Sequence, residues 1–492
     1  MANEVRISKL ICTVLYLVHV NGYVFYGFGN GYRYLTKQLS NAGLFDASAL
    51  SSVEAKWIEQ PLDHFDENET RTWKMRYFEN LEFWQPNGTI YLFIGGEGEA
   101  SPVWLTMGIL YELANETNGA IFGSEHRYYG KSMPLNNLVT DNLKFLSSRQ
   151  ALADLETLLK YVRSLPKFEK STDSKVVLIG GSYPGNLAAW MKLLYPNLID
   201  AAIASSAPVL AKKDFFEYLE TVADDYEQHG TPECYDNIAR IFQRYEKLFS
   251  SAEGIKLLKE EEKICEDNDM TKLENKQLFF MDKTSPFMIR AQYGNPAYIQ
   301  THCKKLANSS RVASLQQFFD DEPSFWREET ECFDYDFYNM IDEVKEIDWA
   351  VSWIYQTCTE FGYYQSTNSD AHPFTRNIPA DLYYKMCLGM FGHEFNEERI
   401  NAGVLNTNKL YNGLTPNVTH VVFVNGDMDP WHRLGVLEDV SYEAPAKIIP
   451  AASHCRDLFS NRKGDPEELK EARKYIKYLI EKWTGFGEYT VD

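Results

Sequence analysis

Short apolar runs alternate with amphipathic stretches in the first half of the chain. Four of these runs have the length and composition of buried strands, at residues 89–94, 120–124, 176–180 and 201–205. Between the second and third runs, residues 148–165 place leucine and valine at helical spacing. Apolar strands that alternate with helices are typical of a parallel sheet covered on both faces. The pattern of residues 50–208 therefore predicts the first part of an α/β domain.

The alternation stops after residue 208 and resumes near the C-terminus. Residues 209–394 contain long helical patterns, many aromatic residues and six cysteines. The elements that follow are strands at 420–425 and 446–449, and an amphipathic helix at 466–483 with an acidic start. We therefore expect one α/β domain in two parts, 50–208 and 395–492, with a helical insertion at 209–394 between them.

The N-terminus has the pattern of a secretory signal peptide. Arg6 and Lys9 precede an apolar run at residues 10–20, which is too short to cross a bilayer. A short signal anchor or a hydrophobic strand is the alternative. We expect residues 1–22 to be removed and the mature chain to have no membrane span. Five sequons support a secreted or lysosomal glycoprotein: Asn68, Asn87, Asn115, Asn308 and Asn417.

Charge and cysteine content narrow the class of protein. The chain has 492 residues and a net charge of −21, which argues against nucleic acid and anionic membranes as partners because both bind basic patches. None of the cysteines has the C-x-x-C spacing of a zinc site, and we expect no metal and no organic cofactor. In an oxidising compartment, three disulfides are favoured among the cysteines of the insertion. These are Cys234, Cys265, Cys303, Cys332, Cys358 and Cys387. Of the other two cysteines, Cys12 lies in the predicted signal peptide, and Cys455 is left without a predicted partner.

A glycine-flanked serine follows the third strand. The segment Gly-Gly-Ser-Tyr-Pro-Gly at 180–185 joins this apolar strand to a helical pattern. A sharp strand-to-helix turn holds Ser182 clear of the backbone, as a nucleophile requires, and the N–H of Tyr183 is then an oxyanion donor. Pro184 stands where glycine is usual, but the first turn of a helix tolerates proline. The alternative is a glycine-rich turn with an incidental serine.

An acid and a histidine follow the last two predicted strands. Asp427 and Asp429 come after the strand at 420–425, and His454 comes after the next one. Serine, acid and histidine in this order, each after a strand, are typical of doubly wound hydrolases. The residue type alone does not choose between the two aspartates. His432 competes with His454, but it lies too close to Asp429 to occupy a separate strand-end loop.

These segments resemble the prolyl-carboxypeptidase family of serine peptidases, which includes lysosomal Pro-X carboxypeptidase, dipeptidyl peptidase II and thymus-specific serine protease. The resemblance runs from about Trp57 to the C-terminus. It is carried by the serine turn, Glu-His-Arg-Tyr-Tyr-Gly-Lys-Ser at 125–132, Asn-Gly-Asp-Met-Asp-Pro-Trp at 425–431 and Ser-His at 453–454. Pro184 and the Gly-Gly-Glu-Gly segment at 95–98 look nearest to the thymus-specific branch.

The resemblance implies a fold and a triad. The fold is an α/β-hydrolase with an inserted helical, disulfide-bearing cap. The catalytic residues are Ser182, Asp429 and His454, and the aspartate is the one that precedes Pro-Trp. The implied cap disulfides are Cys234–Cys303, Cys265–Cys332 and Cys358–Cys387. His432 and Cys455 depart from the residues that are usual in the family at these positions.

The resemblance also implies an exopeptidase that cleaves short peptides near proline, with peptides as partners and a homodimer left open. Gly96 would supply the second oxyanion N–H. Glu97 would bind the amine of the substrate, unless it forms a buried ion pair with Arg127. Trp431 would line the proline slot, unless it only packs beneath the acid loop. An esterase or lipase on the same fold and a non-catalytic binding protein are the alternative functions.

Overall fold

The computed structural model describes residues 53–169, 171–308, 315 and 332–486. The predicted signal peptide at 1–22 and the side chain of Asn308 lie outside this part of the chain. Within these ranges, no helix combines the length and the apolar character needed to cross a membrane.

Eight strands form one sheet in the order β1-β2-β4-β3-β5-β6-β9-β10. Their bounds are β1 (Glu54–Pro61), β2 (Thr72–Asn80), β3 (Ile90–Phe93), β4 (Ala120–Ser124), β5 (Val176–Gly181), β6 (Ala201–Ser205), β9 (Val421–Gly426) and β10 (Ala446–Ile449). β1, β2 and β4 pair antiparallel, and every other neighbouring pair is parallel. All six predicted strands are confirmed, whereas the β1–β2 hairpin was not predicted.

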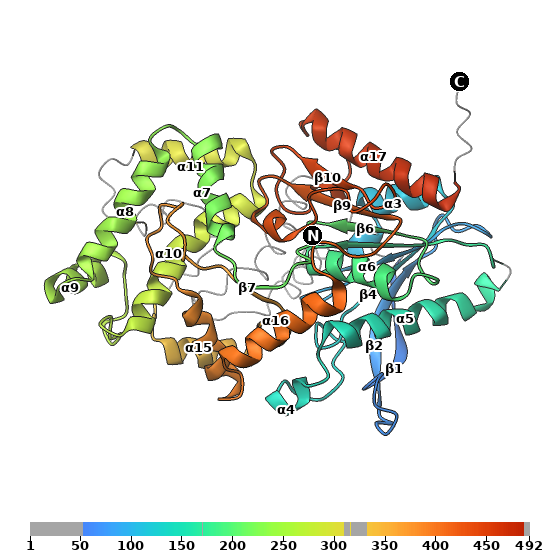
Figure 1. Ribbon diagram of the computed structural model, residues 1–492, viewed down its shortest axis with the longest axis horizontal. Helices are drawn as coiled ribbons and strands as arrows, with labels where there is room; N and C mark the ends of the chain where they lie inside the picture. The colour runs from blue at the N-terminus through green and yellow to red at the C-terminus, as the bar shows by residue number, and fades with distance from the viewer. Residues whose placement is uncertain (1–52, 170, 309–314, 316–331, 487–492) are drawn as a thin grey trace, which may run out of the picture.

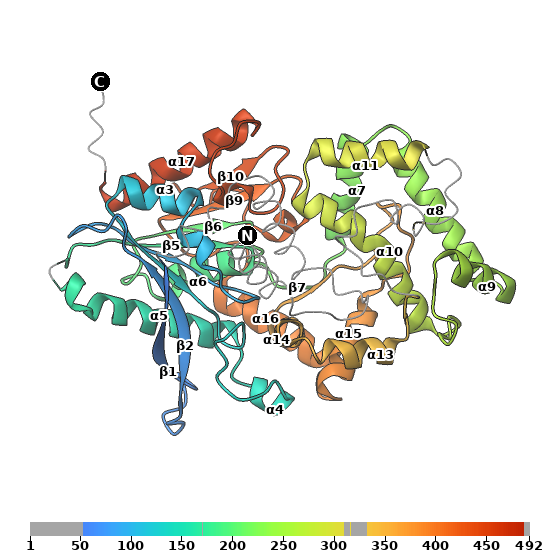
Figure 2. The same ribbon diagram turned by 180° about the vertical axis from the view of Figure 1, so that it is seen from behind.

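Helices cover both faces of this sheet (Figures 1 and 2). α3 (Gly108–Glu116) and α17 (Glu467–Thr484) pack on one face, and α5 (Ser148–Ser164) and α6 (Tyr183–Leu194) pack on the other. Separate apolar cores fill the two layers, as expected when the strands of a parallel sheet are apolar on both sides. The strand order and the two helical layers are those of the α/β-hydrolase fold.

The chain between β6 and α16 (Glu397–Tyr411) forms a largely helical cap. In Figure 1 its helices α7 to α11 lie to the left of the sheet. The helices of the cap are α7 (Glu217–His229), α8 (Cys234–Leu248), α9 (Ala252–Glu261), α10 (Leu273–Tyr293), α11 (Pro296–Asn308), α13 (Phe337–Val344), α14 (Asp348–Gln356) and α15 (Ala380–Phe391). A short parallel pair, β7 (Lys212–Asp214) and β8 (Gly362–Tyr364), joins the start of this cap to the segment between α14 and α15.

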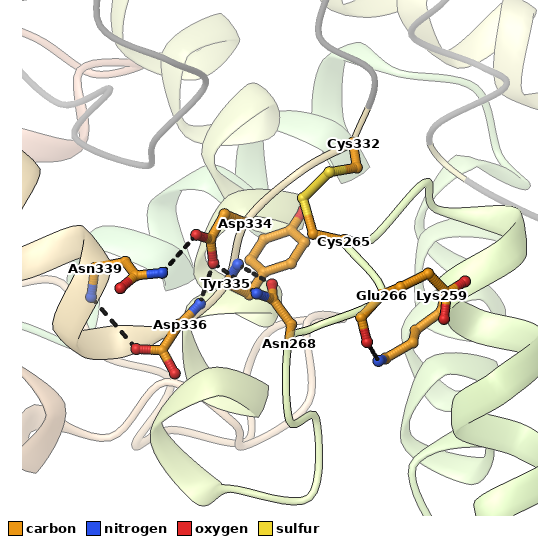
Figure 3. The surroundings of a disulfide bond; sticks show 9 residues. All are labelled: Lys259, Cys265, Glu266, Asn268, Cys332, Asp334, Tyr335, Asp336 and Asn339. Carbon is orange, nitrogen blue, oxygen red and sulfur yellow. Dashed lines mark hydrogen bonds between the residues drawn. A yellow bond between two sulfur atoms is a disulfide. The ribbon is translucent and has the colours of Figure 1, made fainter.

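Three disulfides stabilise the cap in the predicted pairing. Cys234–Cys303 joins α8 to α11, and Cys358–Cys387 joins the π-helix η4 (Thr357–Phe361) to α15. Cys265–Cys332 joins the segment after α9 to the one before α13. Figure 3 shows that Asn268 donates to Asp334 beside this third bridge, at 2.7 Å. Among the cysteines that the structure describes, Cys455 is the one outside these disulfides.

The Glu-His-Arg-Tyr-Tyr-Gly block contributes buried charges that fasten the sheet to α5. The guanidinium of Arg127 donates to both carboxylate oxygens of Asp154, at 2.6 and 2.7 Å, and both side chains are at most 2% exposed. Glu125 pairs with Arg76, and it accepts a hydrogen bond of 2.8 Å from the hydroxyl of Ser132. A buried charge is tolerated only when it is paired in this way.

The Arg127–Asp154 pair makes a test of the fold possible. Asp154→Asn leaves the Arg127 guanidinium buried with half of its charge-assisted bonds, so we expect a loss of about 3 kcal/mol in the free energy of unfolding. Glu156→Gln is the matched control, because the half-buried Glu156 pairs with the exposed Lys160 on the same helix. It should change stability by less than about 0.5 kcal/mol. Thermal melts that place the two variants at the same stability would contradict this prediction.

Candidate active site

Ser182 occupies a strained turn between β5 and α6. Its backbone has φ 65° and ψ −136°, a combination that few residues other than glycine adopt. The turn is crowded: a Cβ on Gly180 would lie 2.0 Å from the carbonyl oxygen of Pro184, and one on Gly181 would lie 2.8 Å from Cys455 Sγ. The flanking glycines therefore permit a sharp turn that presents the hydroxyl of Ser182 at the end of the strand.

Asp429 and His454 are hydrogen-bonded to each other. Asp429 Oδ2 lies 2.7 Å from His454 Nδ1, and the other carboxylate oxygen accepts the N–H of Trp431 at 3.1 Å. Asp429 is fully buried and caps the short helix η5 (Pro430–Leu434). Burial alone would lower the pKa of His454, but the adjacent carboxylate outweighs it, and the pKa is well above its ordinary value. The pair is suited to holding and stabilising a protonated imidazole.

The competing aspartate and histidine lie elsewhere. Asp427 Oδ1 accepts the N–H of Ala451 at 2.7 Å, so this carboxylate braces the loop that follows β10. His432 Nδ1 contacts the carbonyl oxygen of Asp429 at 2.7 Å, and burial lowers its pKa. The carboxylate that contacts His454 is therefore that of Asp429, which is the one implied by the resemblance.

The serine turn and the histidine loop meet at the end of β6. The N–H of Ser182 donates to the carbonyl of Ser205 at 2.9 Å, and the N–H of Cys455 donates to the hydroxyl of Ser206 at 2.9 Å. Within the residues that the structure describes, no direct hydrogen bond joins the hydroxyl of Ser182 to His454. Hydrogen bonds between a nucleophile and its base are often long before substrate binds.

Gly96 lies close to the first turn of α6, which begins at Tyr183. A Cβ on Gly96 would be 2.4 Å from Pro184 Cγ, so the loop after β3 touches the first turn of α6. The phenol of Tyr183 is buried and contacts His126 Nε2 at 2.9 Å and Gln356 Nε2 at 3.0 Å. The N–H groups of Gly96 and Tyr183 thus belong to two touching segments, as an oxyanion site requires.

This anchor for Tyr183 was not predicted from the sequence. His126 belongs to the Glu-His-Arg-Tyr-Tyr-Gly block, which could have indicated its place, and burial lowers its pKa to about 4. Gln356 comes from α14 of the cap, and it also accepts a hydrogen bond from Tyr129 at 2.7 Å. Nothing in the sequence around Gln356 indicated this role.

Glu97 and Trp431 have different surroundings. Glu97 is half-buried, and burial raises its pKa to about 7, with His454 close enough to oppose that rise. Arg127 pairs with Asp154, so the alternative ion pair between Glu97 and Arg127 is wrong. Trp431 is only 1% exposed and packs against the rings of Phe215, Tyr218 and Tyr363, with centroids 5.4 to 5.6 Å apart.

The cap reaches the histidine loop directly. The carbonyl of Gln292, in the last turn of α10, accepts the N–H of His454 at 2.8 Å. The carbonyl of Gly294 accepts the hydroxyl of Ser453 at 2.7 Å, and the ring of Tyr293 stands edge-on to His454 with centroids 5.8 Å apart. The site therefore lies between the strand ends and the cap. No cluster of three or more potential metal-ligating side chains occurs in the described residues.

Comparison with known proteins identifies the family. A family model described as Serine carboxypeptidase S28 matches residues 60–476. A putative serine protease of Caenorhabditis elegans is 32% identical over 460 residues, covering 88% of each chain. Thymus-specific serine protease of Mus musculus is 32% identical over 445 residues, covering 87% of each. Lysosomal Pro-X carboxypeptidase of Bos taurus is 28% identical over 460 residues, covering 86% of this chain and 87% of that one.

Among solved structures, proline iminopeptidase of Mycobacterium smegmatis aligns with 87% of this chain and 99% of that chain. The identity is 12% and the TM-score is 0.39, a likeness too distant to carry an inference. The family model and the sequence relatives confirm the resemblance that the motifs predicted. The chain belongs to the serine carboxypeptidase S28 family and is a serine peptidase.

Proposed function

We propose that this serine peptidase is an exopeptidase that cleaves short peptides after proline, with Ser182, Asp429 and His454 as its triad. The observation that carries the proposal is the 2.7 Å hydrogen bond between Asp429 and His454, at the end of two adjacent parallel strands. The strained turn of Ser182 follows a strand of the same sheet, and its neighbour Gly181 faces Cys455 in the histidine loop.

The chemistry follows from these positions. Ser182 attacks the carbonyl carbon of the scissile bond while His454 Nε2 takes the hydroxyl proton. His454 then gives that proton to the leaving amine, and Asp429 holds the ring by Nδ1 and stabilises its charged form. The N–H groups of Tyr183 and Gly96 donate to the oxyanion of the tetrahedral intermediate. Water repeats the cycle on the acyl-enzyme.

The cap supports action at a chain end. It contributes contacts to the histidine loop and to Tyr183, so the site is enclosed by two layers of the molecule. An enclosed site admits a peptide terminus more readily than an internal segment of a folded protein. Proline suits a preformed apolar slot because its ring has little conformational entropy to lose. Trp431 is only 1% exposed, so its proposed part is to support the wall of that slot from beneath, packed against its ring neighbours in the cap.

Glu97 is the proposed anchor for the substrate amine. Its carboxyl is half-buried beside His454 and has a pKa of about 7, so a cationic peptide terminus would pair with it when it is ionised. A relative named Pro-X carboxypeptidase acts, by its name, at the other end of a peptide. The charge of Glu97 favours binding by the amino end in this chain.

A secretory route, ending outside the cell or in lysosomes, is also proposed. Four of the predicted glycosylation sites are exposed in the structure: Asn68, Asn87, Asn115 and Asn417. Exposure is what attachment of a glycan requires, and three disulfides are typical of an oxidising compartment. Peptides are the proposed partners, and a homodimer stays a prediction.

The nucleophile and the specificity are tested together. Purified wild-type protein should react with a fluorophosphonate probe and should release the arylamine from dipeptide arylamides that end in proline at least about tenfold faster than from those that end in alanine. Ser182→Ala should lose both reactions while its secreted yield stays normal. Labelling of the variant would refute Ser182. Internal digestion of a folded protein, or a preference for simple esters over peptides, would refute the exopeptidase assignment.

The acid is tested by a matched pair of substitutions in one loop. Asp429→Asn should lower kcat by about 10⁴, because the amide favours the wrong tautomer of His454. Asp427→Asn removes a brace of the loop and should lower kcat by less than about tenfold. Steady-state kinetics on folded samples of both variants provide the measurement. A larger loss for Asp427→Asn would reverse the assignment.

The role of Glu97 is tested with substrates whose amino terminus is free or acetylated. Glu97→Gln should raise KM about tenfold or more for free substrates and leave the KM of acetylated ones unchanged. The wild-type preference for a free amine should grow as pH rises from 5.5 to 7, because the carboxyl ionises through its pKa of about 7. In the glutamine variant that growth should vanish. An equal KM rise for both substrate types would show that Glu97 does not bind the amine.

A further inference from the structure

The end of a cap helix is bonded to the catalytic histidine loop. Carbonyls in the last turn of a helix lack partners within the helix. At the C-terminal end of α10, the carbonyl of Gln292 is satisfied by the N–H of His454 at 2.8 Å. The carbonyl of Gly294 is satisfied by the hydroxyl of Ser453 at 2.7 Å. The cap therefore holds the histidine loop at two consecutive residues, by the side chain of Ser453 and by the backbone of His454.

The side chain of Gln292 links this helix end to α7. Its Oε1 accepts the hydroxyl of Tyr218 at 2.7 Å, and its Nε2 donates to the hydroxyl of Tyr293 at 2.9 Å. Tyr218 in turn stands edge-on to the ring of Trp431, with centroids 5.6 Å apart. The N–H of Trp431 donates to Asp429. One continuous series of contacts thus runs from Asp429 through the cap to His454.

The members of this series are shielded from solvent. Tyr218 and Trp431 are 1% exposed and Gln292 is 2% exposed. Side chains with so little surface cannot be the direct contacts of a substrate in this arrangement. Their polar groups are paired in the interior, where a missing partner is costly. A merely packing role would not need the Tyr218 hydroxyl and the Gln292 amide to be bonded to each other.

We propose that Tyr218 and Gln292 are positioning residues that set the geometry of the Asp429–His454 pair from the cap. The inference rests on the proposed triad and extends it. The Tyr218–Gln292 hydrogen bond holds α7 against the end of α10, and so it fixes the loop of the acid relative to the loop of the base. The cap is thereby part of the catalytic machinery as well as a cover.

The experiment compares two reactions of the secreted protein. Diisopropyl fluorophosphate is a small probe that reports the reactivity of Ser182 without filling peptide subsites. Tyr218→Phe and Gln292→Leu should lower its second-order inactivation constant and the peptide kcat in parallel, by about tenfold to a hundredfold, because small misplacements of catalytic groups have effects of this size. KM should change by less than about threefold.

Tyr245→Phe is the matched control. Tyr245 is a fully buried cap tyrosine whose hydroxyl donates to Glu262, with no link to the triad loops. This variant should lower the melting temperature and leave the inactivation constant of folded enzyme unchanged. The double variant Tyr218→Phe/Gln292→Leu should be no worse than Gln292→Leu alone, because both changes break the same bond.

Three results would overturn the inference. A rise in KM with an unchanged inactivation constant would make Gln292 a substrate contact. A lower melting temperature with unchanged kcat would make the bond structural only. Additive losses in the double variant would show that the two side chains act separately. If the wild type itself failed to react with the probe, both the proposed triad and this inference would be refuted. If the wild type reacts and its variants have the same inactivation constant, the inference alone is refuted.

Discussion

Parallel pairing of β5, β6, β9 and β10 brings the carboxyl ends of four strands to one edge of the sheet. Everything that the proposed mechanism uses from the α/β domain lies in the loops at this edge. β5, β6 and β9 are buried on both sides, so a one-residue slip would move every side chain to the opposite helical layer, where it would not fit the packing. The register of the strands is therefore strongly specified, and it determines the relative positions of the loops that follow them.

The parallel strands could be predicted because each one, apart from Lys447 in β10, begins as an apolar run, whereas the first hairpin could not. β1 and β2 carry charged residues whose burial depends on distant partners. Arg76 in β2 is buried because Glu125, after β4, pairs with it. Glu125 lies 49 residues after Arg76. The residues next to Arg76 in the sequence therefore suggest a polar, exposed segment. The ion pair, a tertiary interaction, overrides the local pattern here.

The residue pattern predicted a serine, an acid and a histidine after successive strands, but it could not choose between two aspartates in the same loop. Asp427 and Asp429 follow the same strand, and only the pairing of β9 with β10 separates them, since it places Ala451 over Asp427 and His454 over Asp429. The resemblance resolved that choice before the structure did. Neither the sequence pattern nor the resemblance predicted the contacts made by the cap. Gln292 and Gln356 are ordinary polar residues in helices far along the chain from the loops that they bind.

The disulfide Cys234–Cys303 gives the cap a geometry on which the proposed positioning can rest. It joins the start of α8, which follows α7, to α11, which follows α10. The turn between α7 and α8 is pressed against the bridge, since a Cβ on Gly230 would lie 2.7 Å from Cys303 Sγ. The two helices that carry Tyr218 and Gln292 are thus tied indirectly, through a covalent bond between the helices α8 and α11 that follow them, and directly by a hydrogen bond near the active site. Two such ties prevent one helix from sliding along the other, so the hydrogen bond has a fixed frame in which to align the acid and the base.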